Sequence, residues 1–261
     1  MGAGMAEQKT NSFDLTGRVV VVTGGASGIG GGIAEMLSEA GATVVIADID
    51  AARAGAAAAA LVAAGGKAHH VQINVADEAS VVRGCAEVVA AYGTPWALVN
   101  NAGLQDRQML LDGTVAEWDR VMAVNSRGPF LMTREIARAM VGAKQGGRIV
   151  HIASAALIGA LTQGHAIYAS SKAALLGLAR ASALELVEHA ITVNTVLPGG
   201  VATPGAIGAK GPEPLGPGRR SPPLGMCEAR DIGAAVLFLV SPAARKITNE
   251  VLSVDGGWSI C

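Results

Sequence analysis

One short stretch near the start of the chain limits the folds open to it. Residues 18–23 form a short β-branched run, typical of a strand buried on both faces. Glycines follow from Gly24 to Gly30, and apolar residues then recur at helical spacing from Ile33 up to Gly41. A strand, a glycine turn and a helix N-terminus can seat a phosphate, because backbone N–H groups and the helix dipole favour the anion there. The stretch predicts an α/β fold that binds a dinucleotide, with a plain tight turn as the alternative.

Apolar strands and helical patterns alternate through the rest of the chain. Further short strands are predicted at residues 43–47, 68–73, 96–99, 148–153, 191–197 and 251–254. Helices are predicted at residues 51–64, 77–92, 115–140, 166–188 and 228–240, and the third of these could break at Gly128-Pro129. This alternation predicts one domain at residues 13–261, built as a doubly wound, seven-stranded parallel sheet with helices on both faces.

The composition suits such a fold and excludes some partners. Hydrophobic residues make up 51% of the chain and aromatic residues only 3%, so aliphatic side chains and 35 glycines must form the core. A formal net charge of −1 leaves no basic surface for nucleic acid or anionic lipid. Residues 149–171 contain no Asp, Glu, Lys or Arg, but polar groups and glycines interrupt them. We expect neither a nucleic acid nor a membrane as partner.

The cysteines, the histidines and two segments complete the outline. Cys85, Cys227 and Cys261 match no metal-ligand spacing and cannot form an even disulfide framework, which favours a reducing cytoplasm. The five histidines form no ligand cluster, so no metal is predicted. Residues 1–12 lack an apolar core of signal-peptide length and are predicted to be a flexible tail. Residues 204–224 are rich in Pro and Gly without apolar periodicity, which predicts a mobile loop or lid.

An acidic residue follows the second predicted strand. Asp48 comes about twenty residues after the glycine turn, where a carboxylate can accept hydrogen bonds from an adenosine ribose and would repel a 2′-phosphate. No Arg or Lys at position 49 or among the turn glycines could bind that phosphate. We therefore expect NAD rather than NADP. The alternative is that Asp48 only caps the next helix, a role that Asp50 could fill equally well.

A tyrosine and a lysine four residues apart carry the candidate chemistry. Tyr168 and Lys172 lie on one face if residues 166–188 are helical. A free tyrosine has a pKa of roughly 10, and a nearby ammonium would favour its phenolate. Ser154 ends a predicted strand, and the loop after it can bring the hydroxyl beside the phenol. The alternative is a surface tyrosine next to a solvated lysine. Asn125 needs a partner if it is buried, and a bond to backbone would suffice.

Together these motifs resemble the short-chain dehydrogenase/reductase family in its form of about 250 residues. The resemblance covers residues 23–258 and rests on TGGASGIG at 23–30, Asp48, NNAG at 100–103, Asn125, Ser154, the Tyr168/Lys172 pair, PG at 198–199 with Thr203, and DGGW at 255–258. It implies a Rossmann fold and an NAD-dependent enzyme. Two positions depart from the family pattern: Asn74 replaces a usual Asp beside the adenine, and Thr248-Asn249 replaces Thr-Gly.

The resemblance also implies a role for each matching residue. Tyr168 would be the general base in alcohol oxidation, and Lys172 would lower its pKa and hold the nicotinamide ribose. Ser154 would bind the substrate oxygen, and Asn125 would anchor a water that links Lys172 to solvent. Cofactor contacts are implied for Gly24, Ser27, Gly28, Ile29, Gly30, Asp48, Ile49, Asn74, Val75, Asn101, Ala102, Gly103, Tyr168, Lys172, Pro198, Gly199, Val201 and Thr203.

Position alone predicts the substrate contacts, which are Gln105, Arg107, Ala156, Gln163, His165 and Gly200. Few aromatic and several hydrogen-bonding groups favour a small polar secondary alcohol such as a polyol, sugar or hydroxy acid. Arg107, Arg219 and Arg220 could pair with a carboxylate, although solvated loop arginines are the commoner outcome. The alternatives are a 3-oxoacyl thioester reductase or other carbonyl reductase, normally NADPH-dependent, and a non-catalytic NAD-binding regulator. The resemblance further implies a homotetramer that packs residues 115–140, 166–188 and 251–261.

Overall fold

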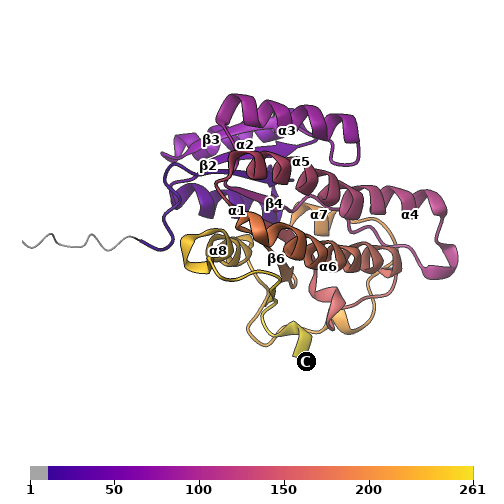
Figure 1. The fold of residues 1–261 in the computed structure, drawn as a ribbon. Helices are drawn as coiled ribbons and strands as arrows, with labels where there is room; N and C mark the ends of the chain where they lie inside the picture. Colours follow the sequence, from indigo (N-terminus) through magenta and orange to yellow (C-terminus); the bar gives the residue numbers. More distant parts are fainter. Residues whose placement is uncertain (1–10, 261) are drawn as a thin grey trace, which may run out of the picture.

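A seven-stranded parallel sheet in the order β3-β2-β1-β4-β5-β6-β7 forms the centre of the computed structural model (Figure 1). The strands are β1 (Val19–Thr23), β2 (Thr43–Asp48), β3 (Lys67–Gln72), β4 (Ala97–Asn100), β5 (Gly147–Ile152), β6 (Ile191–Pro198) and β7 (Val251–Val254). The strand order reverses between β1 and β4, and in such sheets ligands bind outside the carboxyl ends of the strands at that point. The predicted fold class is confirmed. The structure describes residues 11–260, so most of the predicted tail and Cys261 lie outside the described residues.

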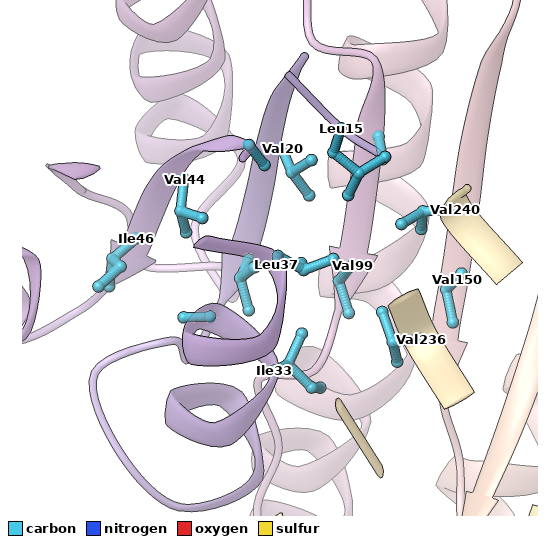
Figure 2. Packing of buried hydrophobic residues seen from close by; sticks show 14 of the residues in the cluster. Leu15, Val20, Ile33, Leu37, Val44, Ile46, Val99, Val150, Val236 and Val240 are labelled. Atoms are coloured by element: carbon cyan, nitrogen blue, oxygen red, sulfur yellow. The ribbon is translucent and has the colours of Figure 1, made fainter. Parts of the chain in front are cut away.

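Helices cover both faces of the sheet. They are α1 (Gly28–Glu39), α2 (Ala51–Ala63), α3 (Glu78–Tyr92), α4 (Val115–Met122), α5 (Gly128–Ala143), α6 (Ala166–Leu186), α7 (Pro204–Ile207) and α8 (Ala229–Val240). Strand residues alternate between the faces, so Val20 and Val22 pack with α1 and α8, whereas Val21 packs with α3 and α5. Figure 2 shows the hydrophobic core between the sheet and helices α1 and α8. Each fully buried Val, Leu or Ile contributes about 1.5–3 kcal/mol relative to exposure.

Helix α1 begins five residues earlier than the sequence pattern indicated, inside the glycine turn. Gly30 and Gly32 are poor helix formers, which hid this start. Close packing requires them: a Cβ on Gly32 would lie 2.6 Å from the backbone of Ala229 on α8, and one on Gly30 would lie 2.6 Å from Asn101 Nδ2. The glycines thus hold the N-terminus of α1 against the sheet and α8.

The predicted break at Gly128-Pro129 is wrong. The chain stays helical from α4 into α5 through a five-residue π-helical turn, Ala123–Arg127. Pro129 comes directly after this π-helical turn, where the regular hydrogen-bond pattern is already interrupted, so its missing N–H does not end the helix. Such π-turns are frequent at functional sites, and this one contains Asn125.

Residues 204–224 contain more structure than the sequence pattern indicated. They include α7 and a 3₁₀ turn at Pro217–Arg219, and they pack on neighbouring loops. Within residues 11–260, no helix is long and apolar enough to cross a membrane. The same residues hold no cluster of three or more His, Cys, Asp or Glu side chains that could bind a metal ion.

Candidate active site

The glycine turn between β1 and α1 borders the crevice at the carboxyl ends of the strands. Gly24 and Gly28 have φ values of 62° and 57°, the left-handed region that favours glycine. A Cβ on Gly24 would lie 2.9 Å from the Cα of Ala102, so the turn and the loop after β4 touch through their backbones. Asn101 Nδ2 fastens the two loops by donating to Thr23 O at 3.0 Å and Gly24 O at 3.2 Å.

Asp48 lies at the end of β2 with its carboxylate facing this turn. Its Oδ2 accepts the N–H of Ala26 at 3.4 Å, and its Oδ1 accepts that of Asp50 at 3.1 Å. Asp50, not Asp48, caps α2 by accepting the N–H of Arg53 at 3.0 Å. The capping alternative for Asp48 is therefore wrong, and a carboxylate remains at the position where a Rossmann fold binds the ribose.

Two other predicted cofactor positions follow the neighbouring strands. Asn74 comes after β3, where its Oδ1 accepts the N–H of Ala76 at 3.1 Å and so shapes a local turn. Thr203 caps α7 by accepting the N–H of Ala206 at 3.1 Å. A Cβ on Gly28 would lie 3.1 Å from Thr203 Cβ, which places Thr203 beside the glycine turn.

Tyr168 and Lys172 lie on the first turns of α6 and face inward. Their side chains belong to residues only 8% and 5% exposed, which excludes the solvated surface pair. The Ser154 side chain lies near the Tyr168 phenol, where it favours the phenolate and so lowers the phenol's pKa. Ser154 follows β5 and also accepts the N–H of Ala156 at 3.1 Å. Lys172 Nζ donates to the carbonyl of Ile152 at 2.8 Å, so β5 holds both the serine and the lysine. The structure brings Ser154, Tyr168 and Lys172 together as the sequence predicted.

Burial sets the protonation of this pair. Burial raises the pKa of the Tyr168 phenol, and the nearby Ser154 side chain offsets this only in part. Burial also lowers the pKa of the Lys172 ammonium to about 8. A lowering of the tyrosine pKa by Lys172 stays a prediction, and burial opposes it. The phenol is an acid near neutral pH and becomes a base only as the pH rises.

Asn125 is fully buried in the π-turn and uses its amide on two sides. Its Oδ1 accepts the N–H of Leu104 at 2.8 Å, while Nδ2 donates to Leu104 O at 2.8 Å and to Ser171 Oγ at 2.9 Å. These bonds tie the loop after β4 to α6. A Cβ on Gly103 would lie 3.3 Å from Lys172 Nζ and 3.4 Å from Asn125 Oδ1, so the glycine admits both groups. The role of Asn125 in a water relay stays a prediction.

The predicted substrate residues separate into two groups. Ala156 is buried next to Ser154, and the His165 ring lies 5.1 Å from that of Tyr168 and within 2.9 Å of Thr162 Oγ1. Gly200 faces Met226 and Trp258, since a Cβ there would lie 2.9 Å from the indole and closer still to the methionine. The sequence analysis did not identify Met226 as a residue that packs against Gly200. Trp258 was noted only as part of a motif.

The Arg107 guanidinium lies near His165 and donates to residues 204–224. Its Nε donates to Pro212 O at 2.8 Å and its Nη2 to Ala209 O at 3.4 Å. The Gln163 N–H likewise donates to Leu215 O at 2.7 Å. Carbonyls of residues 204–224 therefore engage two of the five guanidinium N–H donors, and a substrate role for Arg107 stays a prediction. Gln105 is half-buried nearby on the same loop.

Known proteins resemble this chain over almost its full length. A family model described as enoyl-(acyl carrier protein) reductase matches residues 24–259. The 2,5-dichloro-2,5-cyclohexadiene-1,4-diol dehydrogenase LinX of Sphingobium indicum is 37% identical over 249 residues, with 94% of this chain and 98% of that protein covered. The NAD-dependent glycerol dehydrogenase of Listeria innocua is 35% identical over 255 residues, with 95% and 96% covered.

A solved structure agrees with these relatives. The 3-ketoacyl-(acyl-carrier-protein) reductase of Brucella melitensis, complexed with NADH, has a TM-score of 0.86 at 32% identity, with 95% of this chain and 100% of that chain covered. The chain belongs to the short-chain dehydrogenase/reductase family. It is an oxidoreductase of a family that binds a nicotinamide cofactor.

The described residues fit such a cofactor. The N-cap residue of α1, Ser27, makes no side-chain hydrogen bond to the first N–H groups of the helix, which suits a pyrophosphate site. Asp48 presents a carboxylate beside the glycine turn, and Gly103 opens the space in front of Lys172. These three features lie along the carboxyl edge of the sheet, where open α/β folds bind their ligands.

Proposed function

We propose that this protein is an NAD-dependent dehydrogenase that oxidises a secondary alcohol group of a small, neutral diol or polyol. The observation that carries the proposal is the grouping of half-buried Ser154 with buried Tyr168 and Lys172 at the carboxyl end of β5. An intact set of this kind speaks against a regulator that kept the fold without the chemistry. The relatives named as diol and glycerol dehydrogenases support the substrate class.

Each protein group has a task in the proposed reaction. The Ser154 hydroxyl donates to the substrate oxygen and holds it beside the phenol. Tyr168 takes the alcohol proton in oxidation or gives a proton in ketone reduction. Lys172 supplies a positive charge that favours the phenolate, and Asn125 ties the loop after β4 to α6, the helix that carries Tyr168 and Lys172. The nicotinamide, when bound, accepts the hydride, so the protein contributes geometry and electrostatics.

A neutral substrate follows from the position of the cations. The guanidinium of Arg107, which could have bound a carboxylate, donates instead to backbone carbonyls. Arg219 lies 3.8 Å from Glu213 in an exposed ion pair. Neither Arg107 nor Arg219 therefore presents a free guanidinium for the bidentate pairing that usually binds a carboxylate. The remaining competitor is a 3-oxoacyl thioester reductase, the class named for the Brucella melitensis structure.

The test is a rate survey of diols, polyols, hydroxy acids and 3-oxoacyl thioesters with NAD(H) and NADP(H). We expect neutral diols or polyols with NAD to give the highest kcat/KM. Asp48→Ala should lower the preference for NAD over NADP by about 10- to 100-fold, since a hydrogen bond to a charged group is worth about 1.5–3 kcal/mol. Asp50→Ala, which removes the neighbouring carboxylate and the α2 cap, is the matched control. A wild-type preference for NADP, or for thioesters, would overturn the proposal.

We further propose a homotetramer. Apolar side chains remain exposed on α4, α5 and α6, including Trp118, Phe130 and Leu184. Scattered exposed apolar residues are common, but these three lie on the helices that the family resemblance assigns to subunit contacts. Light scattering should give a mass about four times the 26.1 kDa of the chain, and a monomeric mass would contradict the assembly.

A further inference from the structure

Three segments of the chain meet at Arg107. Its backbone N–H donates to Lys210 O at 2.7 Å, and its guanidinium donates to Pro212 O at 2.8 Å and to Ala209 O at 3.4 Å. The next residue, Gln108, donates its N–H to Gly164 O at 2.9 Å. The loop after β4 thereby joins residues 204–224, here termed the lid, to the loop that leads into α6 and Tyr168.

Asp106 adds a charged support to the same junction. Its Oδ1 accepts the N–H of Lys210 at 2.8 Å, and its Oδ2 pairs with Arg120 Nη2 at 2.6 Å. Arg120 is held in turn by Glu117 at 2.6 Å on α4. Lys210 thus has its N–H and its carbonyl bonded to adjacent residues of one loop. We term Asp106, Arg107 and Arg120 the clasp.

The glycines of the lid fit a docked segment. Gly211 has φ +115°, and a Cβ there would run into the carbonyl of Arg107. A Cβ on Gly218 would lie 2.7 Å from Ala160 O, and one on Gly216 would lie 3.2 Å from Leu161 O. Backbone hydrogen bonds from Gly218 N to Leu161 O and from Gln163 N to Leu215 O join the lid to the loop that leads into α6. These glycines let the backbone of the lid lie directly on the backbone of the neighbouring loops. From the sequence, the same glycines had been interpreted as a sign of flexibility.

We propose that Arg107, supported by Asp106 and Arg120, is a positioning residue that holds the lid closed against the loops flanking Tyr168 and does not contact the substrate. The ends of the lid are fixed separately, by Thr203 beside Gly28 and by the Leu224 N–H, which donates to Gly256 O at 2.9 Å. The clasp therefore controls the middle of the lid. Closure of this kind excludes water from a reacting site and retains the substrate.

Limited trypsin digestion tests the clasp without relying on catalysis. Trypsin cuts after lysine and arginine in segments that can extend into the protease, and the lid carries Lys210, Arg219 and Arg220. We expect cleavage after these residues, mapped by mass spectrometry, to be about tenfold faster in Arg107→Ala than in the wild type. Arg230→Ala removes an exposed arginine from α8, paired with Glu39 at 2.7 Å, and is the control for lost charge.

Two further variants separate a clasp from a substrate contact. Arg107→Lys keeps the charge but loses the planar group that reaches two carbonyls, so it should behave like Arg107→Ala. Gly211→Ala should also release the lid, because its Cβ meets Arg107, whereas Gly205→Ala, whose Cβ has no neighbour closer than 4.0 Å, should not. Equal digestion of Arg107→Ala, Gly211→Ala and the wild type would overturn the proposal.

Steady-state kinetics of alcohol oxidation provide a second test of the clasp. Unlike the digestion, this test rests on the proposed dehydrogenase function. Release of the lid should raise KM for the alcohol about tenfold with a smaller change in kcat, because the catalytic groups stay in place. Restored KM and slow digestion in Arg107→Lys would show that the charge, not the clasp, matters and would refute the proposal. A protein without any dehydrogenase activity that still shows the digestion pattern would refute the proposed function and leave the clasp intact.

Discussion

Replacing Tyr168 with phenylalanine should lower kcat/KM for alcohol oxidation about 10²- to 10⁴-fold, the usual contribution of a positioned acid or base. The ring still fills its buried site on α6, so the fold should persist. Because burial raises the pKa of the phenol, wild-type oxidation should increase with pH as phenolate forms, and reduction should be favoured near neutrality. In Tyr168→Phe, the rise of the oxidation rate with pH that depends on this phenol should disappear.

The control is the other tyrosine of the chain. Tyr92→Phe removes a hydroxyl from a ring that stacks on His69, with 4.3 Å between centroids, at the far end of α3. Its activity and pH profile should match those of the wild type. Binding of NADH to Tyr168→Phe, measured by fluorescence titration, should stay within a few-fold of the wild type. Comparable oxidation by Tyr168→Phe and the wild type would refute the proposed mechanism.

The fold was accessible from the sequence because local signals agreed with one another. Short β-branched runs alternated with helical patterns, and a parallel sheet places such runs in its buried centre. Local patterns failed where tertiary packing overrode propensity. Gly30 and Gly32 are helical because α1 must approach α8 and the loop after β4, contacts that no neighbouring residue reveals. Pro129 ends no helix because it directly follows a π-helical turn, where the regular hydrogen-bond pattern is already interrupted.

The site was predictable to the extent that spacing fixes it. Tyr168 and Lys172 share a face because a helix repeats every 3.6 residues, and Ser154 follows the neighbouring strand. What Arg107 binds could not be predicted, since its partners are backbone carbonyls about a hundred residues further along the chain. The tyrosine pKa was also out of reach. It depends on how deeply the phenol is buried, and burial here outweighs its polar contacts.

The second large effect concerns stability and couples to catalysis. Lys172→Met should abolish most activity yet make the protein about 2 kcal/mol more stable at pH 7. Burial lowers the pKa of this lysine from 10.5 to about 8, so holding the ammonium inside at neutral pH costs about 3 kcal/mol. Methionine removes that cost. The loss of the hydrogen bond from Nζ to Ile152 O destabilises the variant by about 1 kcal/mol, which leaves the net gain of about 2 kcal/mol.

The pH dependence makes this prediction distinct from ordinary repacking. Between pH 8 and 10.5 the folded wild type has released the lysine proton while the unfolded chain still binds it, so wild-type unfolding free energy rises with pH by up to about 1.4 kcal/mol per unit relative to the variant. Other titrating groups are common to both proteins and largely cancel in the difference. Urea unfolding at pH 7 and at steps up to pH 10.5 should therefore show the variant more stable at the start and less stable at the end. A difference in unfolding free energy between variant and wild type that stays constant across this pH range would show that burial does not destabilise the Lys172 ammonium, and would refute the prediction.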